Sequence, residues 1–355
     1  MTENPNAFVC IMAGGSGERF WPMSRQRTPK HLLKLFGDRT LLEETVHRLE
    51  NVVPRANIFI LTNDVQLAAT REALSFLAPE QIVAEPAKRD TAPAAALATG
   101  LVRARNPQGV MALLPADHLI HNTRRLAEQL AAALARAATT DALLTFAIKP
   151  TYPSPGFGYL EMGDVVAHPP ELGQVRQVKR FVEKPDLATA ERYVAAGNYA
   201  WNAGMFIWRA SAFVAETEKH APELANFVKA FPAGDPTSYL AEKFPHLPKI
   251  SVDYAVMEKA AQVETIVAEY DWDDVGMWTS LPPHLPGDEN GNAVRGTVLG
   301  VNAKNNIAIS NGRTVALVGV SDLVVVETAD AVLVCHRDAV QEIKKLMPLL
   351  PKELL

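Results

Sequence analysis

The chain has 355 residues, of which 48% are hydrophobic and 21% are charged, and 35 basic against 40 acidic side chains give a formal net charge of -5. These proportions are typical of a globular protein with a sizeable core, and they exclude a disordered, collagen-like or disulfide-stapled chain. The mildly acidic balance argues against bulk binding to nucleic acid, which needs a basic surface. At roughly 150 residues per domain, the length allows two domains.

The N-terminus and the cysteines bear on localisation. The segment MTENPNAF lacks the basic start and long apolar run of a signal peptide. No stretch approaches the roughly 18 uninterrupted apolar residues of a membrane-spanning helix. Cys10 and Cys335 lie in apolar runs and are expected to be buried free thiols, as in a reducing compartment. We therefore expect a cytoplasmic protein without a membrane partner.

The first 150 residues alternate short apolar runs with helical patterns. The expected strands are Phe8–Ala13, Asn57–Thr62, Gln81–Ala84, Gly109–Leu114 and Ala142–Ile148. The expected helices are Leu41–Val52, Val65–Leu77, Thr91–Ala104 and Arg124–Ala138. Such alternation predicts an α/β fold in which helices cover both faces of a parallel sheet. Ligands of such sheets bind beyond the carboxyl ends of the strands.

The remaining chain is less regular. Residues 151–285 hold many prolines, aromatic residues and strand-like pieces, and we interpret them as a segment that completes a binding cleft. From Gly291 onward, Val/Ile/Leu strands recur every 8–12 residues or so between Asn, Gly and Asp turns, which predicts a small all-β module. A short amphipathic helix is expected over Ala339–Leu346. The Pro- and Gly-rich linker before the module predicts two domains, 1–285 and 286–355.

A glycine-rich loop follows the first expected strand. Gly14, Gly15 and Gly17 allow a tight turn that brings backbone N–H groups close to an anion. Phe20 stands where a dinucleotide fingerprint needs glycine, and the Gly-Lys-Ser/Thr of a P-loop is absent, so neither motif fits. Five basic residues surround a single acid, Glu18; they are Arg19, Arg25, Arg27, Lys30 and Lys34. This charge favours a polyphosphate ligand, and the alternative is an ordinary turn with solvated cations.

Aspartates follow two distant segments. Asp117 comes just after the expected strand Gly109–Leu114, and Asp271, Asp273 and Asp274 lie together far downstream. Magnesium on a nucleotide is typically held by one or two carboxylates, phosphate oxygens and water. The aspartates therefore predict a metal site, with a helix cap as the alternative for Asp117.

Two further segments offer polar groups to a ligand. Glu85 precedes a helix that is expected to begin near Asp90 or Thr91, and its carboxylate or the backbone carbonyls near it can accept hydrogen bonds from a ligand. The alternative is a plain helix start. Glu183 and Lys184 end a strand-like run and can hold a sugar hydroxyl and a sugar phosphate, with an exposed Glu–Lys turn as the alternative.

The segment GGSGERFWPMSRQRTPKHLL resembles the signature of the sugar-nucleotide pyrophosphorylases, and specifically of the bacterial mannose-1-phosphate guanylyltransferases. Similar motifs follow in the family's order: EPAKRDTAPA, PADH, GFGYLE, EKP, WNAGMF and DVGMW. The resemblance implies a Rossmann-like, mixed, mostly parallel sheet flanked by helices, with a short left-handed β-helix at the C-terminus. It implies that GTP and α-D-mannose 1-phosphate react to GDP-mannose and pyrophosphate with Mg²⁺ as cofactor, in a homodimer.

The resemblance also implies the roles of individual residues. The nucleotide-binding set is Ala13, Gly14, Gly15, Gly17, Arg19, Lys30, Glu85, Pro86, Arg89, Thr91 and Asp117. The sugar-phosphate set is Gly158, Tyr159, Glu183, Lys184, Asn202 and Gly204. The metal ligands are Asp117 and Asp274, and the catalytic residues are Arg19, Lys30, Asp117 and Lys184.

Some positions depart from the family's pattern. Met277 replaces the usual serine of the last motif, Lys88 a frequent glycine and Asp90 a frequent asparagine. One alternative is therefore a pyrophosphorylase for another nucleotide or hexose phosphate. A second is a catalytically silent nucleotide-sugar sensor, which the retained metal aspartates and loop cations disfavour.

Overall fold

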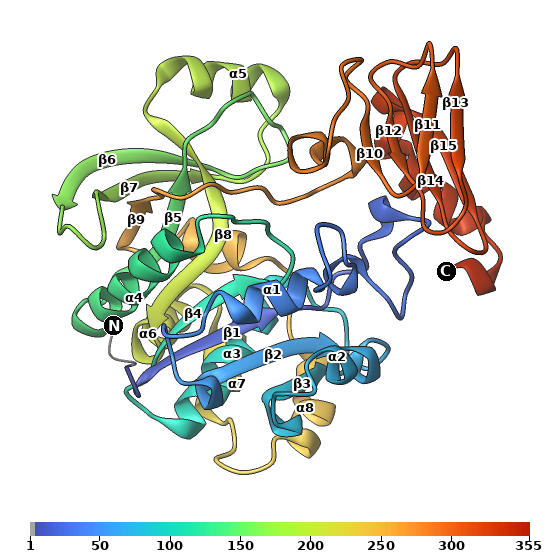
Figure 1. The fold of residues 1–355 in the computed structure, drawn as a ribbon. Helices are drawn as coiled ribbons and strands as arrows, with labels where there is room; N and C mark the ends of the chain where they lie inside the picture. Colours follow the sequence, from blue (N-terminus) through green and yellow to red (C-terminus); the bar gives the residue numbers. More distant parts are fainter. Residues whose placement is uncertain (1–3) are drawn as a thin grey trace.

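The computed structural model describes residues 4–355 and is built on a nine-stranded mixed sheet (Figure 1). The strand order is β3-β2-β1-β4-β8-β5-β9-β7-β6. The strands are β1 (Ala7–Met12), β2 (Ile58–Asn63), β3 (Ile82–Glu85), β4 (Val110–Pro115), β5 (Leu143–Ile148), β6 (Tyr159–Ala167), β7 (Val175–Val182), β8 (Tyr199–Arg209) and β9 (Val263–Val267). Strands β3, β2, β1 and β4 run parallel, so their carboxyl ends meet at one edge.

Helices cover both faces of this sheet. They are α1 (Leu41–His47), α2 (Leu67–Ala73), α3 (Thr91–Arg105), α4 (Thr123–Thr139), α5 (Leu187–Ala196), α6 (Ala210–His220), α7 (Pro222–Lys229) and α8 (Thr237–Lys243). Val9 and Ile11 of β1 belong to a buried cluster with α4, whereas Phe8 and Cys10 belong to a cluster with α3. Successive side chains of a strand point to opposite faces, so each face has its own core. The expected fold class is confirmed.

Two expectations about elements need correction. The helix expected over Leu41–Val52 ends at His47, because the chain continues through turns that close with bonds from Leu49 N–H to Val46 O and from Val52 N–H to Leu49 O. Residues 151–285 contribute β6, β7, β8 and β9 to the central sheet itself. Strand β8 lies antiparallel between β4 and β5, a pairing that no local pattern indicates.

The C-terminal strands form the expected all-β module. Strands β10 (Ala293–Arg295), β12 (Ile307–Ile309) and β14 (Leu323–Glu327) are parallel, and β15 (Val332–His336) closes their sheet antiparallel to β14. Strands β11 (Val298–Val301) and β13 (Val315–Val318) form a second parallel pair. The helix expected over Ala339–Leu346 is divided into a 3₁₀ segment, Arg337–Glu342, and a short helix α9 (Ile343–Leu346).

The loop after β1 and the C-terminal module share a core. Phe20, Trp21, Trp278, Ile307 and Val324 belong to one buried cluster. The Trp278 indole donates to the carbonyl of Trp21 at 3.2 Å. Figure 1 shows the chain after β1 reaching from the sheet toward the module. The loop that carries the basic residues is therefore packed against the C-terminal strands.

Both cysteines are free thiols. Cys10 is buried as expected, and Cys335 is partly buried. No helix within residues 4–355 has the length and apolar character that crossing a membrane requires.

Candidate active site

The glycine-rich loop leaves β1 at the carboxyl edge of the sheet. The Asn63 amide donates to the carbonyl of Gly14 at 3.3 Å, and the Gln66 amide donates to that of Gly15 at 3.2 Å. Within residues 4–355, the N–H groups of Gly14, Gly15 and Ser16 have no acceptor in the protein. Free N–H groups on a tight loop suit an anion. Ala13 only positions the loop, because its N–H and its carbonyl are bonded to Leu61 and Thr62.

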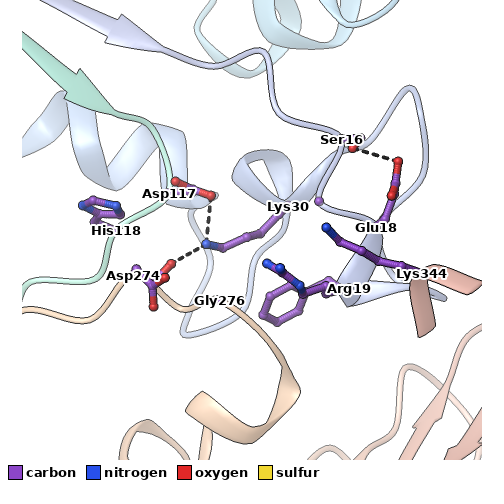
Figure 2. Close-up of a pocket in the computed structure, with 11 residues that line it drawn as sticks. Ser16, Glu18, Arg19, Lys30, Asp117, His118, Asp274, Gly276 and Lys344 are labelled. Carbon is purple, nitrogen blue, oxygen red and sulfur yellow. Dashed lines mark hydrogen bonds and ion pairs between the residues drawn. The ribbon is translucent and has the colours of Figure 1, made fainter. Parts of the chain in front are cut away.

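Gly17 brings this loop against Lys30. Its φ is +63°, and a Cβ at this position would lie 2.6 Å from both Cβ and N of Lys30. Lys30 is 6% exposed, and its ammonium lies 2.8 Å from Oδ2 of Asp117 and donates to the carbonyl of Asp274 at 2.6 Å. Figure 2 shows the ammonium between the two aspartates. The close approach at Gly17 thus fixes a buried lysine between two segments that are distant in sequence.

A cavity of about 280 Å³ opens at this point. Its lining residues are Ser16, Gly17, Glu18, Arg19, Phe20, Lys30, Asp117, His118, Asp274, Gly276 and Lys344. The fold therefore brings together the glycine loop, Asp117 and Asp274, as the sequence predicts. Of the five basic loop residues, only Arg19 and Lys30 line it; Arg25 instead pairs with Asp330 at 2.8 Å. Lys344 was not predicted, because nothing in its local sequence links it to a loop more than 300 residues earlier.

Only one of the three clustered aspartates faces the cavity. Asp271 accepts the N–H groups of His121 and Asn122, and Asp273 accepts from the N–H of Val275. The Asp274 carboxylate forms no ion pair within residues 4–355, and Gly276 lies close beside it, since a Cβ there would lie 3.1 Å from Oδ2 of Asp274. Asp274 is thus the member of this group that can act on a ligand.

The pKa values of the two facing aspartates are shifted in opposite directions. Burial alone would raise the pKa of Asp117, but the Lys30 ammonium and the neighbouring His118 hold it below its usual range. Burial raises the pKa of Asp274 to about 6 against the opposing effect of Lys30, with the charges of Asp273 and Asp117 adding to the rise. Burial also lowers the pKa of His118 to about 4, so this imidazole is neutral at pH 7.

A second cavity of about 340 Å³ adjoins the first at Ser16. Its lining residues are Gly14, Ser16, Gln26, Asn63, Asp64, Val65, Gln66, Glu85, Pro86, Ala87 and Lys88. Burial raises the pKa of Glu85 to about 8. Asn63 and Asp64 were missed, although they directly follow an expected strand at the carboxyl edge, which is the signal that could have found them.

Arg89 and Thr91 do not line this cavity. The Arg89 guanidinium donates to the carbonyl of Pro245, and the Thr91 hydroxyl accepts from the N–H of Val252 at 2.9 Å. Both side chains tie the start of α3 to a distant segment. The structure therefore gives these two residues a positioning role, whereas the resemblance implied direct contact with the nucleotide.

The sugar-phosphate set surrounds Glu183. A Cβ on Gly158 would lie 2.4 Å from Oε2 of Glu183, so only glycine leaves space for this carboxylate. The Lys184 ammonium pairs with Oε1 of Glu183 at 2.5 Å, and the φ of Lys184 is +45°, a strained value for a residue other than glycine. Gly204 also has a positive φ, +66°. These backbone constraints hold the Glu183–Lys184 pair in place.

Asn202 has a defined amide orientation. Its Oδ1 accepts from the Thr145 hydroxyl at 2.8 Å and from the N–H of Gly204 at 3.3 Å, so its amide nitrogen is left to donate to Oδ1 of Asp253 at 3.2 Å. Burial raises the pKa of Asp253 to about 7, and the charge of Glu183 adds to this rise. Asp253 was not given a role from the sequence.

The Tyr159 side chain packs inside the protein. It is completely buried, and its hydroxyl accepts from the N–H of Ser154 at 2.9 Å. The side chain therefore positions the loop that contains Ser154, beside the contact with the sugar that the resemblance implies for this residue.

Aromatic side chains connect the sugar-phosphate set with the aspartates. The Trp272 indole donates to Nδ1 of His118 at 3.1 Å, and the ring centroids of Trp272 and Phe157 are 5.4 Å apart. Phe157 in turn lies 4.8 Å from Trp201, which precedes Asn202 in the chain. A series of packed aromatic side chains thus joins the segment that contains Asn202 to His118, the neighbour of Asp117.

Known proteins match this chain along most of its length. Residues 9–287 match the family described as nucleotidyl transferase, and residues 296–350 match the MannoseP isomerase/GMP-like beta-helix domain. The xanthan biosynthesis protein XanB of Xanthomonas campestris pv. campestris (strain B100) is 40% identical over 344 residues, which are 95% of this chain and 72% of that protein. Mannose-1-phosphate guanylyltransferase of Escherichia coli (strain K12) is 39% identical over 351 residues, 96% of this chain and 72% of the relative.

A solved structure is also similar. The crystal structure described as mannose-1-phosphate geranyltransferase from Thermus thermophilus has a TM-score of 0.88 and 32% sequence identity. The similarity covers 97% of this chain and 99% of that one. Both the sheet and the C-terminal module therefore have counterparts in a known protein.

Proposed function

The chain belongs to the nucleotidyl transferase family, and we propose that it converts GTP and α-D-mannose 1-phosphate to GDP-mannose and pyrophosphate. The observation that carries this proposal is the buried Lys30 ammonium, which lies between Asp117 and Asp274 in the cavity lined by the glycine-rich loop. The relatives named as mannose-1-phosphate guanylyltransferases support the choice of substrates.

The chemistry requires positioning and charge neutralisation. An oxygen of the sugar phosphate attacks the α-phosphorus of GTP, a new P–O bond forms, and the bond from the α-phosphorus to the oxygen bridging to the β-phosphate breaks. Pyrophosphate takes the electron pair of that bond. The attacking phosphate is already ionised at neutral pH, so no general base is needed. Arg19 and Lys30 neutralise charge on the triphosphate, and Lys184 holds the sugar phosphate.

Asp117 and Asp274 are proposed to hold Mg²⁺. Two carboxylates that face one cavity fit this ion, which usually takes one or two carboxylates plus phosphate oxygens and water. Within residues 4–355, no group of three or more His, Cys, Asp or Glu side chains is placed to hold a metal. The nucleotide must therefore complete the coordination. When bound, the ion withdraws charge from the phosphate oxygens.

Substitution of the aspartates tests this assignment. Asp117→Asn and Asp274→Asn are each expected to lower kcat by about a hundredfold or more, because a charged ligand of the metal is lost. Asp338→Asn is the control, since that side chain is 91% exposed and does not line the cavity. Full turnover by the Asp117→Asn variant would overturn the metal assignment.

Glu85 is proposed to select guanine. It lines the cavity that adjoins the triphosphate loop, and the N1 and N2 donors of a bound guanine would favour the ionised carboxylate that burial alone disfavours. The ratio of kcat/KM for GTP over ATP is expected to fall about tenfold or more in Glu85→Gln. An unchanged ratio would favour the alternative, a pyrophosphorylase whose base choice lies elsewhere.

We propose a homodimer formed through the C-terminal module. Leu299, Val301 and Val318 lie on the outer face of the β11–β13 pair and are 60–68% exposed. Burial of these side chains against the same face of a second copy would remove an apolar patch from water. Light scattering should show a dimer that Val301→Lys combined with Val318→Lys converts to a monomer. Val166→Lys, on β6, is the control and should leave the mass unchanged.

A further inference from the structure

Lys344 lines the same cavity as Arg19, although it belongs to the C-terminal helix α9. The preceding residue, Ile343, is 4% exposed and packs in the core shared with Phe20 and Trp21. The buried Ile343 fixes the orientation of α9, and so determines that Lys344 faces the cavity. Figure 2 shows the Lys344 side chain near Arg19 and Glu18, on the opposite side of the cavity from Asp117 and His118.

The cations on this side form no ion pair within residues 4–355; the carboxylate beside them, Glu18, instead accepts from the Ser16 hydroxyl at 3.1 Å. Within residues 4–355, neither Arg19 nor Lys344 forms an ion pair, whereas Lys30 pairs with Asp117 and Lys345 pairs with Glu342 at 2.8 Å. Nε of Arg19 is buried and has no hydrogen-bond partner in the described part of the chain. Two like charges lining one cavity repel each other unless an anion lies between them. The arrangement therefore indicates an anionic ligand.

We propose that Lys344 binds the two terminal phosphates of the nucleoside triphosphate, which leave as pyrophosphate. The inference rests on the proposed function. The base cavity lies beyond Ser16, and the reacting α-phosphate belongs beside Asp117 and Asp274. The side of the cavity that holds Arg19 and Lys344 thus receives the remaining two phosphates. The C-terminal module thereby completes the triphosphate site.

Two contacts fix the position of the C-terminal segment relative to the loop that follows β1. The Trp21 indole donates to the carbonyl of Leu354 at 3.1 Å, and the Arg25–Asp330 ion pair adds a second link. A side chain binds a ligand in a defined geometry only when packing holds its backbone in place. The packing of α9 provides that support for Lys344.

Adjacent lysines allow a matched test. Lys344→Met is expected to raise KM for GTP, and KM for pyrophosphate in the reverse reaction, by about tenfold, while KM for mannose 1-phosphate and for GDP-mannose stays unchanged. Lys344→Arg should restore most of the loss, because the positive charge is retained. Lys345→Met, which removes an ammonium already paired with Glu342, should behave as the unsubstituted protein. Thermal melting confirms that each variant is folded.

Calorimetric titration of inorganic pyrophosphate into the protein, with Mg²⁺ present, separates this inference from the proposed function. If the substrate pair is wrong but the inference holds, pyrophosphate still binds, and Lys344→Met still weakens it. If GDP-mannose forms but Lys344→Met leaves both pyrophosphate affinity and KM for GTP unchanged, the inference is overturned. Equal weakening by Lys344→Met and Lys345→Met would also overturn it, because the effect would then reflect only the general surface charge.

Discussion

At the scale of single residues, Gly158 shows how the absence of a side chain serves the site. Gly158→Ala would place a Cβ 2.4 Å from Oε2 of Glu183 and displace that carboxylate. We expect KM for mannose 1-phosphate to rise about tenfold or more, with KM for GTP unchanged. The nearby Gly156→Ala is the control, since its nearest neighbour would be Oγ of Ser154 at 3.5 Å, an ordinary contact. Steady-state kinetics that change equally in both variants would contradict this role of Gly158.

The protonation of Glu85 makes the stability of the folded protein depend on pH. Its pKa is about 8 in the folded protein, so the folded state keeps a proton that the unfolded state, with the ordinary value of 4.5, has already released. The contribution of Glu85 to stability is therefore complete below about pH 4.5 and is lost as the pH rises to about 8. Relative to the unsubstituted protein, Glu85→Gln should gain melting temperature between about pH 5 and about pH 9, without nucleotide present. A difference that does not change with pH would contradict the buried, unpaired state of Glu85.

The sequence predicted part of the site at this scale. Lys30, Asp117 and Asp274 were predicted from their residue types and motifs, and they line one cavity. A motif does not indicate which of its side chains point into a site: in the structure the Arg89 guanidinium donates to the carbonyl of Pro245, and the Tyr159 hydroxyl accepts from the N–H of Ser154. The sequence gives no role to Asp253 and no sign of Lys344, because long-range packing brings both to the site.

At the scale of elements, the turn at Gly17 is expected to determine where Lys30 lies. Gly17→Ala introduces a Cβ 2.6 Å from Lys30 at a φ of +63°. We expect a loss of stability of about 1–3 kcal/mol and a large drop in kcat, because the lysine must shift. Gly37→Ala is the control, since a Cβ there has no neighbour within 4 Å. Denaturant unfolding and turnover are the measurements, and equal behaviour of the two variants would contradict the account.

Local patterns predicted the first half of the sheet well. Alternating apolar runs and helical segments gave β1 to β5 and α1 to α4 to within a few residues at most ends, because these elements follow one another in βα units. Strand β8 lies antiparallel between β4 and β5, and its place depends on pairing between distant segments. No local period carries that information, so the second half could not be ordered from the sequence.

At the scale of the whole molecule, the C-terminal module contributes Lys344 to the cavity that we propose as the triphosphate site. Ile343→Ala removes a buried side chain under Lys344 and should destabilise the protein by about 2–4 kcal/mol. It should also raise KM for GTP but not KM for mannose 1-phosphate. Leu317→Ala, a buried position inside the β-helix, is the matched control and should lower stability without changing either KM. A rise in KM for GTP in both variants would contradict a specific role of α9.

The central claim is that this site joins GTP to mannose 1-phosphate. The most direct test is pyrophosphate release with Mg²⁺, in which GTP, ATP, UTP and dTTP are each combined with mannose 1-phosphate and glucose 1-phosphate. The account predicts that release is dominated by the pair of GTP and mannose 1-phosphate and is abolished by Asp117→Asn. Release dominated by another pair, or no release from any pair, would contradict it.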